Sequence, residues 1–217
     1  MILENPYLHE FLALPVDHRA NGEPINDQEQ TRGGEYHAHR QHMVNRYSWA
    51  VPTRDAIEAI KARSVRVLEL GAGSGYWAYL MAQVGIDVLA FDPFPPQQCW
   101  YPIHIPTPET PGEHSDRALL LCWPPRHHPM AFDALSAYRG DTVIYVGEHF
   151  RGNAEGFFFN ELWKNWREID RVEIPRWFNR TDDLRAYTRV RSCFGGRQTV
   201  AASATWSRSR ASLDMTY

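Results

Sequence analysis

The hydrophobic positions of the chain fall into short runs, and the run at residues 65–70 leads into the clearest pattern in the sequence. This stretch, VRVLEL, has the apolar, β-preferring composition of a strand that is buried on both faces. Glycines occupy alternate positions through residues 71–75, where they allow a tight turn that a ligand can approach closely. The apolar and aromatic run from Tyr76 to Val84 then predicts a helix that ends at Gly85. Strand, glycine turn and helix in this order indicate the nucleotide-binding start of a doubly wound α/β fold.

Beyond the turn, the pattern continues to alternate strands with helices. Residues 87–92 predict a second strand, parallel and adjacent to the first because β-α-β crossovers are right-handed. Seven prolines within residues 93–116 exclude a long helix there. The remaining elements predicted for this part of the chain are an edge strand at 101–105, strands at 117–123 and 142–146, helices at 130–138 and 157–166, and a hairpin of 169–174 with 184–190.

The two ends of the chain differ from this central part. Residues 1–16 and 36–50 show helical patterns separated by a polar, turn-rich stretch, and Thr53 is placed to cap the helix that leads into the first strand. Residues 192–217 are rich in Ser, Thr, Arg and Ala with few apolar anchors. We therefore expect an N-terminal helical and loop extension at 1–56 that acts as a lid, a core at 57–191, and a loosely ordered tail at 192–217.

Composition narrows the class of protein. A length of 217 residues suits one α/β domain with an extension, and 43% hydrophobic with 23% charged residues is typical of a soluble globular chain. A net charge of −3 argues against a broad basic surface for nucleic acid, although Arg126, Arg139, Arg151 and the tail arginines leave a local patch open. Three cysteines without CxxC spacing argue against a disulfide framework or zinc site and fit a cytoplasmic protein. Neither a signal peptide nor a membrane-spanning run is expected.

The glycine turn carries an acid, Glu69, two residues before its first glycine. A dinucleotide fingerprint would need its third glycine at position 76, where Tyr76 stands, so a dehydrogenase is disfavoured. The pattern resembles motif I of the class I S-adenosylmethionine-dependent methyltransferases, over residues 65–92. The resemblance implies a Rossmann-like fold with a mostly parallel seven-stranded sheet, a reduced third strand and helices on both faces. It also implies S-adenosylmethionine as cofactor, S-adenosylhomocysteine as product, and cofactor contacts from Glu69, Gly71, Gly73 and Gly75.

Asp92 ends the second predicted strand, 21 residues after Gly71. An acid at this position can accept hydrogen bonds from both ribose hydroxyls of an adenosine, and the methyltransferases commonly carry Asp or Glu here. The alternative is an acid that caps the turn before Pro93. We expect Asp92 to bind the cofactor ribose.

Aromatic residues supply the remaining cofactor candidates. Trp123 ends the predicted fourth strand in the sequence LCWPP, and its ring could attract a sulfonium or simply close a buried strand. The Pro pair resembles the motif of amine methyltransferases, but the polar residue before it and the aromatic after it are missing, so amine methylation is not carried over. Tyr47 and Trp49 precede the core, in the part of the chain that often folds over the cofactor in this family. Their rings therefore either line the cofactor pocket or pack on the sheet. Of Tyr76 and Trp77, we expect one to contact the cofactor and the other to pack in the core.

Glu148 and His149 close the fifth predicted strand, at the same sheet edge as Trp123, and are the catalytic candidates. Either group could take a proton from a substrate hydroxyl or amine, or could only orient the substrate. Methyl transfer also gains much of its rate from positioning. His37, His39 and His42 are expected to be exposed polar helix residues, so no metal site is predicted.

These observations favour a methyltransferase that transfers a methyl group to O or N of a small-molecule acceptor. We expect a small-molecule partner, no nucleic acid and no membrane, and the sequence leaves a homodimer open. Two alternatives stay open at this point: a methyltransferase of the same fold that acts on nucleic acid or protein, and a non-catalytic relative that binds the cofactor.

Overall fold

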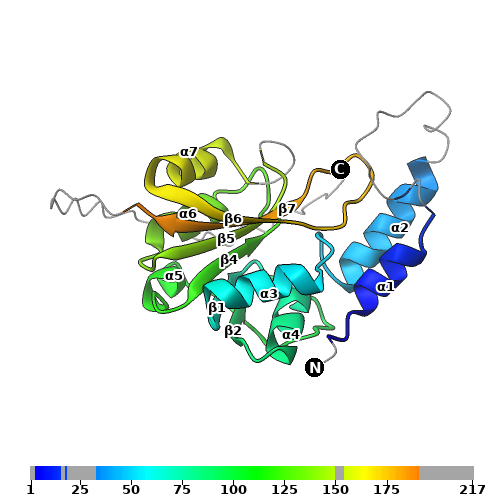
Figure 1. The fold of residues 1–217 in the computed structure, drawn as a ribbon, viewed down its shortest axis with the longest axis horizontal. Helices are drawn as coiled ribbons and strands as arrows, with labels where there is room; N and C mark the ends of the chain where they lie inside the picture. Colours follow the sequence, from blue (N-terminus) through cyan, green and yellow to red (C-terminus); the bar gives the residue numbers. More distant parts are fainter. Residues whose placement is uncertain (1–2, 16–17, 19–32, 150–153, 191–217) are drawn as a thin grey trace, which may run out of the picture.

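The structure is a computed structural model, and it describes residues 3–15, 18, 33–149 and 154–190. Figure 1 shows the arrangement of its helices and strands. In chain order these are α1 (Pro6–Ala13), α2 (Gly33–Arg46), α3 (Arg54–Arg63), β1 (Arg66–Leu70), α4 (Tyr76–Gln83), β2 (Asp87–Phe91), β3 (Ile103–His104), α5 (Thr110–Glu113), β4 (Ala118–Cys122), α6 (Met130–Ala137), β5 (Thr142–Gly147), α7 (Gly156–Asn165), β6 (Trp166–Glu173) and β7 (Asp183–Arg189).

The strands form one seven-stranded sheet in the order β3-β2-β1-β4-β5-β7-β6. The five strands from β1 to β5 run parallel, and β7 pairs antiparallel with β5 and β6. The predicted fold class is confirmed, including a third strand of only two residues. Because β7 is antiparallel, its first residue, Asp183, pairs with Gly147 at the carboxyl end of β5. The start of β7 therefore lies at the edge where the parallel strands end.

Helices cover both faces of the sheet, and alternate strand residues feed two separate cores. Helices α3 and α4 cover one face, whose core contains Val67 and Leu120, and α6 and α7 cover the other, whose core contains Leu68 and Leu119. This alternation follows from the pleat of a strand, which points successive side chains to opposite faces. Burial of the central strands on both sides explains why their sequences are continuous apolar runs.

Local sequence signals account for several element boundaries. The side chain of Thr53 accepts a hydrogen bond of 3.1 Å from the backbone nitrogen of Ala56, so the predicted cap of α3 is confirmed. Asn5 caps α1 in the same way, and Pro6 follows at the first helical position.

One predicted boundary is wrong. The sequence pattern placed Trp166 at the end of a helix, but α7 ends at Asn165 and Trp166 begins β6, three residues before the expected strand start. Trp166 pairs with Arg189 across the hairpin and stacks on Tyr138, with 6.1 Å between ring centroids. These contacts between distant parts of the chain override the helical pattern that runs through Phe157–Asn165. The predicted tail at 192–217 and most of the predicted loop at 17–35 lie outside the described residues.

Helices α1 and α2 pack together at the carboxyl edge of the sheet (Figure 1). The rings of Tyr7 and Tyr47 stack with 4.9 Å between their centroids, and Tyr7 also accepts a hydrogen bond of 3.0 Å from the indole of Trp177. The hydroxyl of Tyr36 donates to the carbonyl of Phe178 over 3.0 Å. The N-terminal helices are thereby joined to the connection between β6 and β7. Among the described residues, no helix combines the length and the apolar character that crossing a membrane would need.

Candidate functional site

The glycine turn after β1 combines one open position with two packed ones. Gly71, Gly73 and Gly75 all have positive φ, at 72°, 54° and 73°, in the left-handed region that glycine adopts without strain. A Cβ added at Gly75 would lie 2.8 Å from Ile103 and 3.0 Å from Tyr101, whereas one added at Gly73 would meet nothing within 4 Å. Gly73 therefore borders open space at the end of β1, and a side chain there would fill it.

Glu69 lies beneath this turn with its carboxyl group buried. The residue is 1% exposed, and its Oε2 has no hydrogen-bond partner. Burial raises the pKa of Glu69 from an ordinary 4.5 to about 8, and the nearby charge of Asp92 adds to the increase, while a hydrogen bond from the backbone of Ala78 opposes it. An unsatisfied buried carboxyl group is costly unless a ligand supplies the missing partner. A cationic or hydrogen-bond-donating group would do so.

Asp92 joins the end of β2 to the same turn. Its Oδ2 accepts a hydrogen bond of 2.8 Å from the backbone nitrogen of Gly73, and its Oδ1 accepts one of 2.7 Å from that of Phe94. Burial raises the pKa of this carboxyl group. Each carboxylate oxygen keeps a free lone pair, so Asp92 can also accept hydrogen bonds from a ligand hydroxyl. The carboxyl groups of Glu69 and Asp92 thus offer acceptor oxygens on either side of the glycine turn, whose Gly73 borders open space.

Tyr47 is connected to the glycine turn by its backbone rather than by its ring. Its carbonyl oxygen accepts a hydrogen bond from the hydroxyl of Ser74, and its own hydroxyl donates to Glu10 over 2.6 Å. Its ring is 1% exposed and packs among aromatic neighbours, including Trp100 at 5.4 Å between centroids. Tyr47 therefore connects the end of α2 to the glycine turn through this backbone hydrogen bond.

Trp123 follows β4 in a left-handed conformation, with φ at 50°, which is unusual for a residue other than glycine. Its backbone nitrogen donates to the carbonyl of Val146 over 2.8 Å, and its indole nitrogen donates to Asp182 over 3.0 Å. Its ring stacks on Trp49, with 5.3 Å between centroids and 13° between planes. These contacts bring the end of β4, the segment after α2 and the start of β7 into one cluster.

Two arginines lie against this pair of indoles. The guanidinium of Arg40 is 4.9 Å from the ring centroid of Trp49 and 5.3 Å from that of Trp123, and the guanidinium of Arg180 is 5.6 Å from that of Trp123. Arg40 is 5% exposed, and its Nε and Nη2 have no hydrogen-bond partner. Burial lowers the pKa of Arg40, and the neighbouring Arg180 lowers it further. The cation–π contacts stabilise the guanidinium but leave Nε and Nη2 without a hydrogen-bond acceptor.

Asp182 is the acid of this cluster, and it is fully buried. Its Oδ1 accepts the hydrogen bond from Trp123, while its Oδ2 has no partner. Burial raises the pKa of Asp182 from an ordinary 3.8 to about 7, the charge of Glu148 adds to the increase, and Arg40 and Arg180 oppose it. A carboxyl group with this pKa exists in both protonation states near neutral pH.

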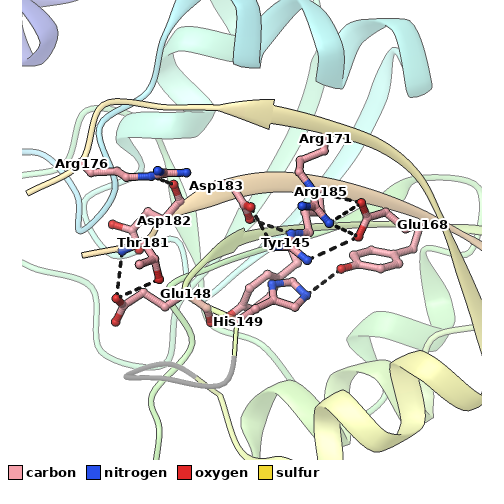
Figure 2. A network of polar contacts seen from close by, with 11 residues as sticks. Tyr145, Glu148, His149, Glu168, Arg171, Arg176, Thr181, Asp182, Asp183 and Arg185 are labelled. Atoms are coloured by element: carbon pink, nitrogen blue, oxygen red, sulfur yellow. Dashed lines mark hydrogen bonds and ion pairs between the residues drawn. The ribbon is translucent and has the colours of Figure 1, made fainter. Parts of the chain in front are cut away.

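The two catalytic candidates lie in the polar network of Figure 2, where Glu148 points toward Thr181. One carboxylate oxygen of Glu148 accepts from the backbone nitrogen of Thr181 over 3.0 Å, and the other forms an ion pair with Arg180 at 3.2 Å. His149 shares a hydrogen bond of 2.8 Å between its Nε2 and the hydroxyl of Tyr187. Burial lowers the pKa of His149 to about 4, so its imidazole is neutral at neutral pH. Glu148 thus holds the segment that carries Arg180 and Asp182.

The other sequence candidates are placed as follows. Tyr76 and Trp77 are both buried in the core cluster that also contains Tyr7 and Tyr47. The histidines of α2 are exposed, and His39 contacts His18 at 3.3 Å. In the part of the chain that the structure describes, no group of three or more His, Cys, Asp or Glu side chains could hold a metal ion. Arg126 and Arg139 are exposed, and Arg151 lies outside the described residues.

Sequence reasoning missed Arg40 and Asp182. In the sequence, Arg40 lies among His37, His39 and His42 of α2, and this histidine pattern raises the question of a metal site rather than of a site for an anion. Asp182 lies in the connection before β7, which the pattern marked only as a hairpin link. One signal was present: an antiparallel strand that closes a parallel sheet begins at the edge where the parallel strands end, so an acid at its start lies near the ligand edge.

Comparison with known proteins agrees with this architecture. A family model described as a methyltransferase domain matches residues 36–181, which is more than half of the chain. The search of curated proteins found no match.

Solved structures resemble this chain at low sequence identity. The 1,6-didemethyltoxoflavin-N1-methyltransferase of Burkholderia thailandensis is 13% identical, with a TM-score of 0.46, over 79% of this chain and 93% of that one. The magnesium protoporphyrin IX methyltransferase of Synechocystis PCC 6803 is 10% identical, with a TM-score of 0.43, over 78% and 90%. The tRNA (m1A58) methyltransferase of Aquifex aeolicus is 11% identical, with a TM-score of 0.42, over 67% and 72%. Their acceptors differ widely, and similarities at this level carry no argument about the acceptor of this chain.

Proposed function

Since this chain belongs to the class I S-adenosylmethionine-dependent methyltransferase family, we propose that it transfers the methyl group of S-adenosylmethionine to an oxygen or nitrogen of a small-molecule acceptor. The family match confirms the enzyme class and the methyl donor predicted from residues 65–92. The acceptor class is our proposal, and one observation carries it: α1 and α2 cover the reactive edge of the sheet.

The groups around the glycine turn fit the cofactor. The unpartnered Oε2 of Glu69 suits the ammonium group of the methionine portion, and the open space at Gly73 admits the chain between methionine and ribose. Asp92 has lone pairs left for the ribose hydroxyls. When bound, S-adenosylmethionine supplies an electrophilic methyl group on its sulfonium. The side chains of Glu69 and Asp92 would orient it and hold it in place.

The cover over the edge supports a small acceptor. The hydroxyl of Ser74 binds the carbonyl of Tyr47, and Trp49 stacks on Trp123, so the segment after α2 contacts the ends of both β1 and β4. The topological switch point of the sheet, where α/β folds bind their ligands, lies between these two strands. An acceptor that must fit beneath this cover is limited in size. We propose that the extension of residues 1–56 acts as the lid expected from the sequence.

The group that we propose as proton acceptor is Asp182, in place of Glu148, which the sequence favoured. We propose that Glu148 is a positioning residue, since its carboxylate is already bound to Arg180 and Thr181. Asp182 has a free oxygen and a pKa of about 7, which suits a group that accepts a proton from an acceptor hydroxyl or amine. His149 keeps the catalytic role as a second proposal, because its neutral imidazole lies beside the same edge.

The experiment that tests this function offers small and large acceptors together. The purified protein is incubated with methyl-deuterated S-adenosylmethionine and either a protein-free metabolite extract, total RNA or a protein extract. We expect label in low-molecular-mass products detected by mass spectrometry, and none in the acid-precipitable fraction.

The control is Asp92→Ala, which removes the acceptor expected for the ribose. It should weaken S-adenosylhomocysteine binding by about ten- to hundredfold, the loss typical of a charged hydrogen-bond acceptor, and should abolish labelling. Label found only in RNA or protein would contradict the small-molecule proposal. Absence of S-adenosylhomocysteine binding in calorimetry would contradict the cofactor assignment.

A further inference from the structure

The cluster of Arg40, Trp49, Trp123 and Asp182 contains unused hydrogen-bonding groups that nothing in the fold explains. The Nε and Nη2 of Arg40 are buried without partners, and so is the Oδ2 of Asp182. Both residues are at least nine-tenths buried, at 5% and 0% exposed. A folded protein rarely leaves such groups unsatisfied, because each costs about 1–3 kcal/mol. Two unsatisfied groups of opposite charge in one cluster indicate a ligand with complementary groups.

The unpartnered atoms of Arg40 define the chemistry of that ligand. Nε and Nη2 form one edge of the guanidinium, and the two parallel N–H bonds of that edge match the two oxygens of a carboxylate. The face of the guanidinium is already used against the rings of Trp49 and Trp123. Arg180 is paired with Glu148, and among the described residues the partly protonated Asp182 is the acid that balances the charge of Arg40. A bound anion would satisfy the edge and the charge together.

The position of the cluster identifies which ligand carries the carboxylate. Arg40 lies on α2, about two helical turns before Tyr47. Tyr47 is in turn hydrogen-bonded to the glycine turn. It is surrounded by the end of β4 and the start of β7, while Glu69 and Asp92 lie at the ends of β1 and β2. The cluster is therefore on the acceptor side of the switch point.

We propose that the methyl acceptor is a small molecule with a carboxylate, held by the free edge of Arg40, and with a neighbouring N–H or O–H group, held by the free oxygen of Asp182. Trp49 and Trp123 form an aromatic wall beside it. This inference rests on the proposed function, because it assumes that the edge binds a methyl acceptor. It names the acceptor class that the proposed function left open.

The test uses two pairs of aromatic probes that differ in one group. Benzoate and anthranilate carry the carboxylate, and benzamide and 2-aminobenzamide carry a neutral amide of the same shape. Each is titrated calorimetrically into the protein saturated with S-adenosylhomocysteine. We expect the wild type to bind each carboxylate at least about tenfold more tightly than its amide, as befits a bidentate charged pair. Arg40→Gln should reduce this preference to about twofold or less.

Two further variants separate the parts of the proposal. The wild type should also bind anthranilate more tightly than benzoate, since only anthranilate carries the adjacent N–H group, and Asp182→Asn should remove this preference. Arg46→Gln is the matched control, because it removes an exposed arginine from the same helix and should change no probe affinity.

Three results would overturn the inference: equal binding of carboxylates and amides by the wild type, an Arg40→Gln variant that keeps the preference, or an Arg40→Gln variant whose main loss is in S-adenosylhomocysteine affinity. The last result would assign the guanidinium to the methionine carboxylate of the cofactor. Binding of S-adenosylhomocysteine by the wild type, measured first, tests the proposed function separately.

Discussion

The indole nitrogen of Trp123 donates a hydrogen bond of 3.0 Å to the carboxylate of Asp182, joining residues 59 positions apart in the chain. The bond connects the end of β4, a central parallel strand, to the residue before β7, the antiparallel strand that closes the sheet. Both partners are buried. This contact therefore fixes the direction of Oδ1 of Asp182, and with it the direction in which the unpartnered Oδ2 points.

Trp123→Phe should destabilise the protein by about 1–3 kcal/mol, because it leaves a buried acceptor without its donor. A double-mutant cycle with Asp182→Ala, followed by urea denaturation, should give a coupling energy of about 0.5–3 kcal/mol. Trp163→Phe, at a half-exposed tryptophan, is the control and should change the unfolding free energy by about 0.5 kcal/mol or less. Additive effects of Trp123→Phe and Asp182→Ala would show that the bond contributes nothing to stability.

Glu69→Gln should change how stability depends on pH. The carboxyl group of Glu69 ionises near its ordinary pKa of 4.5 in the unfolded chain and near 8 in the folded protein. Between these values the folded state binds more protons, so the wild type loses stability as pH rises. Glutamine cannot ionise, and the variant should gain stability relative to the wild type from about pH 5 to about pH 8. Urea denaturation across this pH range measures the difference in unfolding free energy between the variant and the wild type. A difference that does not change with pH would mean that Glu69 is already ionised in the folded protein.

Gly73→Ala should separate cofactor binding from folding. The added methyl group meets nothing within 4 Å, so its cost is mainly the left-handed conformation, about 1–2 kcal/mol. It occupies the space proposed for the cofactor, and we expect S-adenosylhomocysteine affinity to fall by more than about tenfold.

Gly75→Ala is the comparison for that variant. Its methyl group would crowd Tyr101 and Ile103, which adds about 1–3 kcal/mol of overpacking to the backbone strain. Thermal unfolding and calorimetry should therefore rank Gly75→Ala as the less stable variant. Normal cofactor affinity in a folded Gly73→Ala protein would exclude this part of the turn from the binding site.

Glu148→Gln tests whether this residue positions others or transfers protons. Its carboxylate binds Arg180 and Thr181, so we expect the loss of charge to reduce stability by about 1–3 kcal/mol and to raise the KM of the acceptor. The pH–rate profile should keep the limb that Asp182 sets, because Glu148 does not exchange protons with the acceptor in our proposal, but this limb should move to lower pH, since the charge of Glu148 contributes to the raised pKa of Asp182. Arg180→Gln should reproduce the loss of stability and the higher KM, and the double variant should show no further loss. A lost limb of the profile in a stable Glu148→Gln protein would instead identify Glu148 as the base.

The sequence by itself determined the family and the fold class, and it supplied the residues of the donor half of the proposed site. Glu69, the glycines through Gly75, and Asp92 belong to one β-α-β unit, whose elements are adjacent in the chain, so their spacing specifies their geometry. The alternating strands and helices of the core followed from the same local patterns. At Trp166 a local pattern failed, because pairing with Arg189 prevailed over helical preference.

Only the tertiary structure brought together the residues of the proposed acceptor half. Arg40, Trp123 and Asp182 come from a helix, a strand end and a hairpin connection, and no spacing in the sequence relates them. Their chemistry depends on burial and on which atoms lack partners. These properties arise only after α2 packs over the sheet and β7 inserts antiparallel beside β5. A polar residue acquires such a role from its neighbours, and for these three residues the neighbours are distant in the chain.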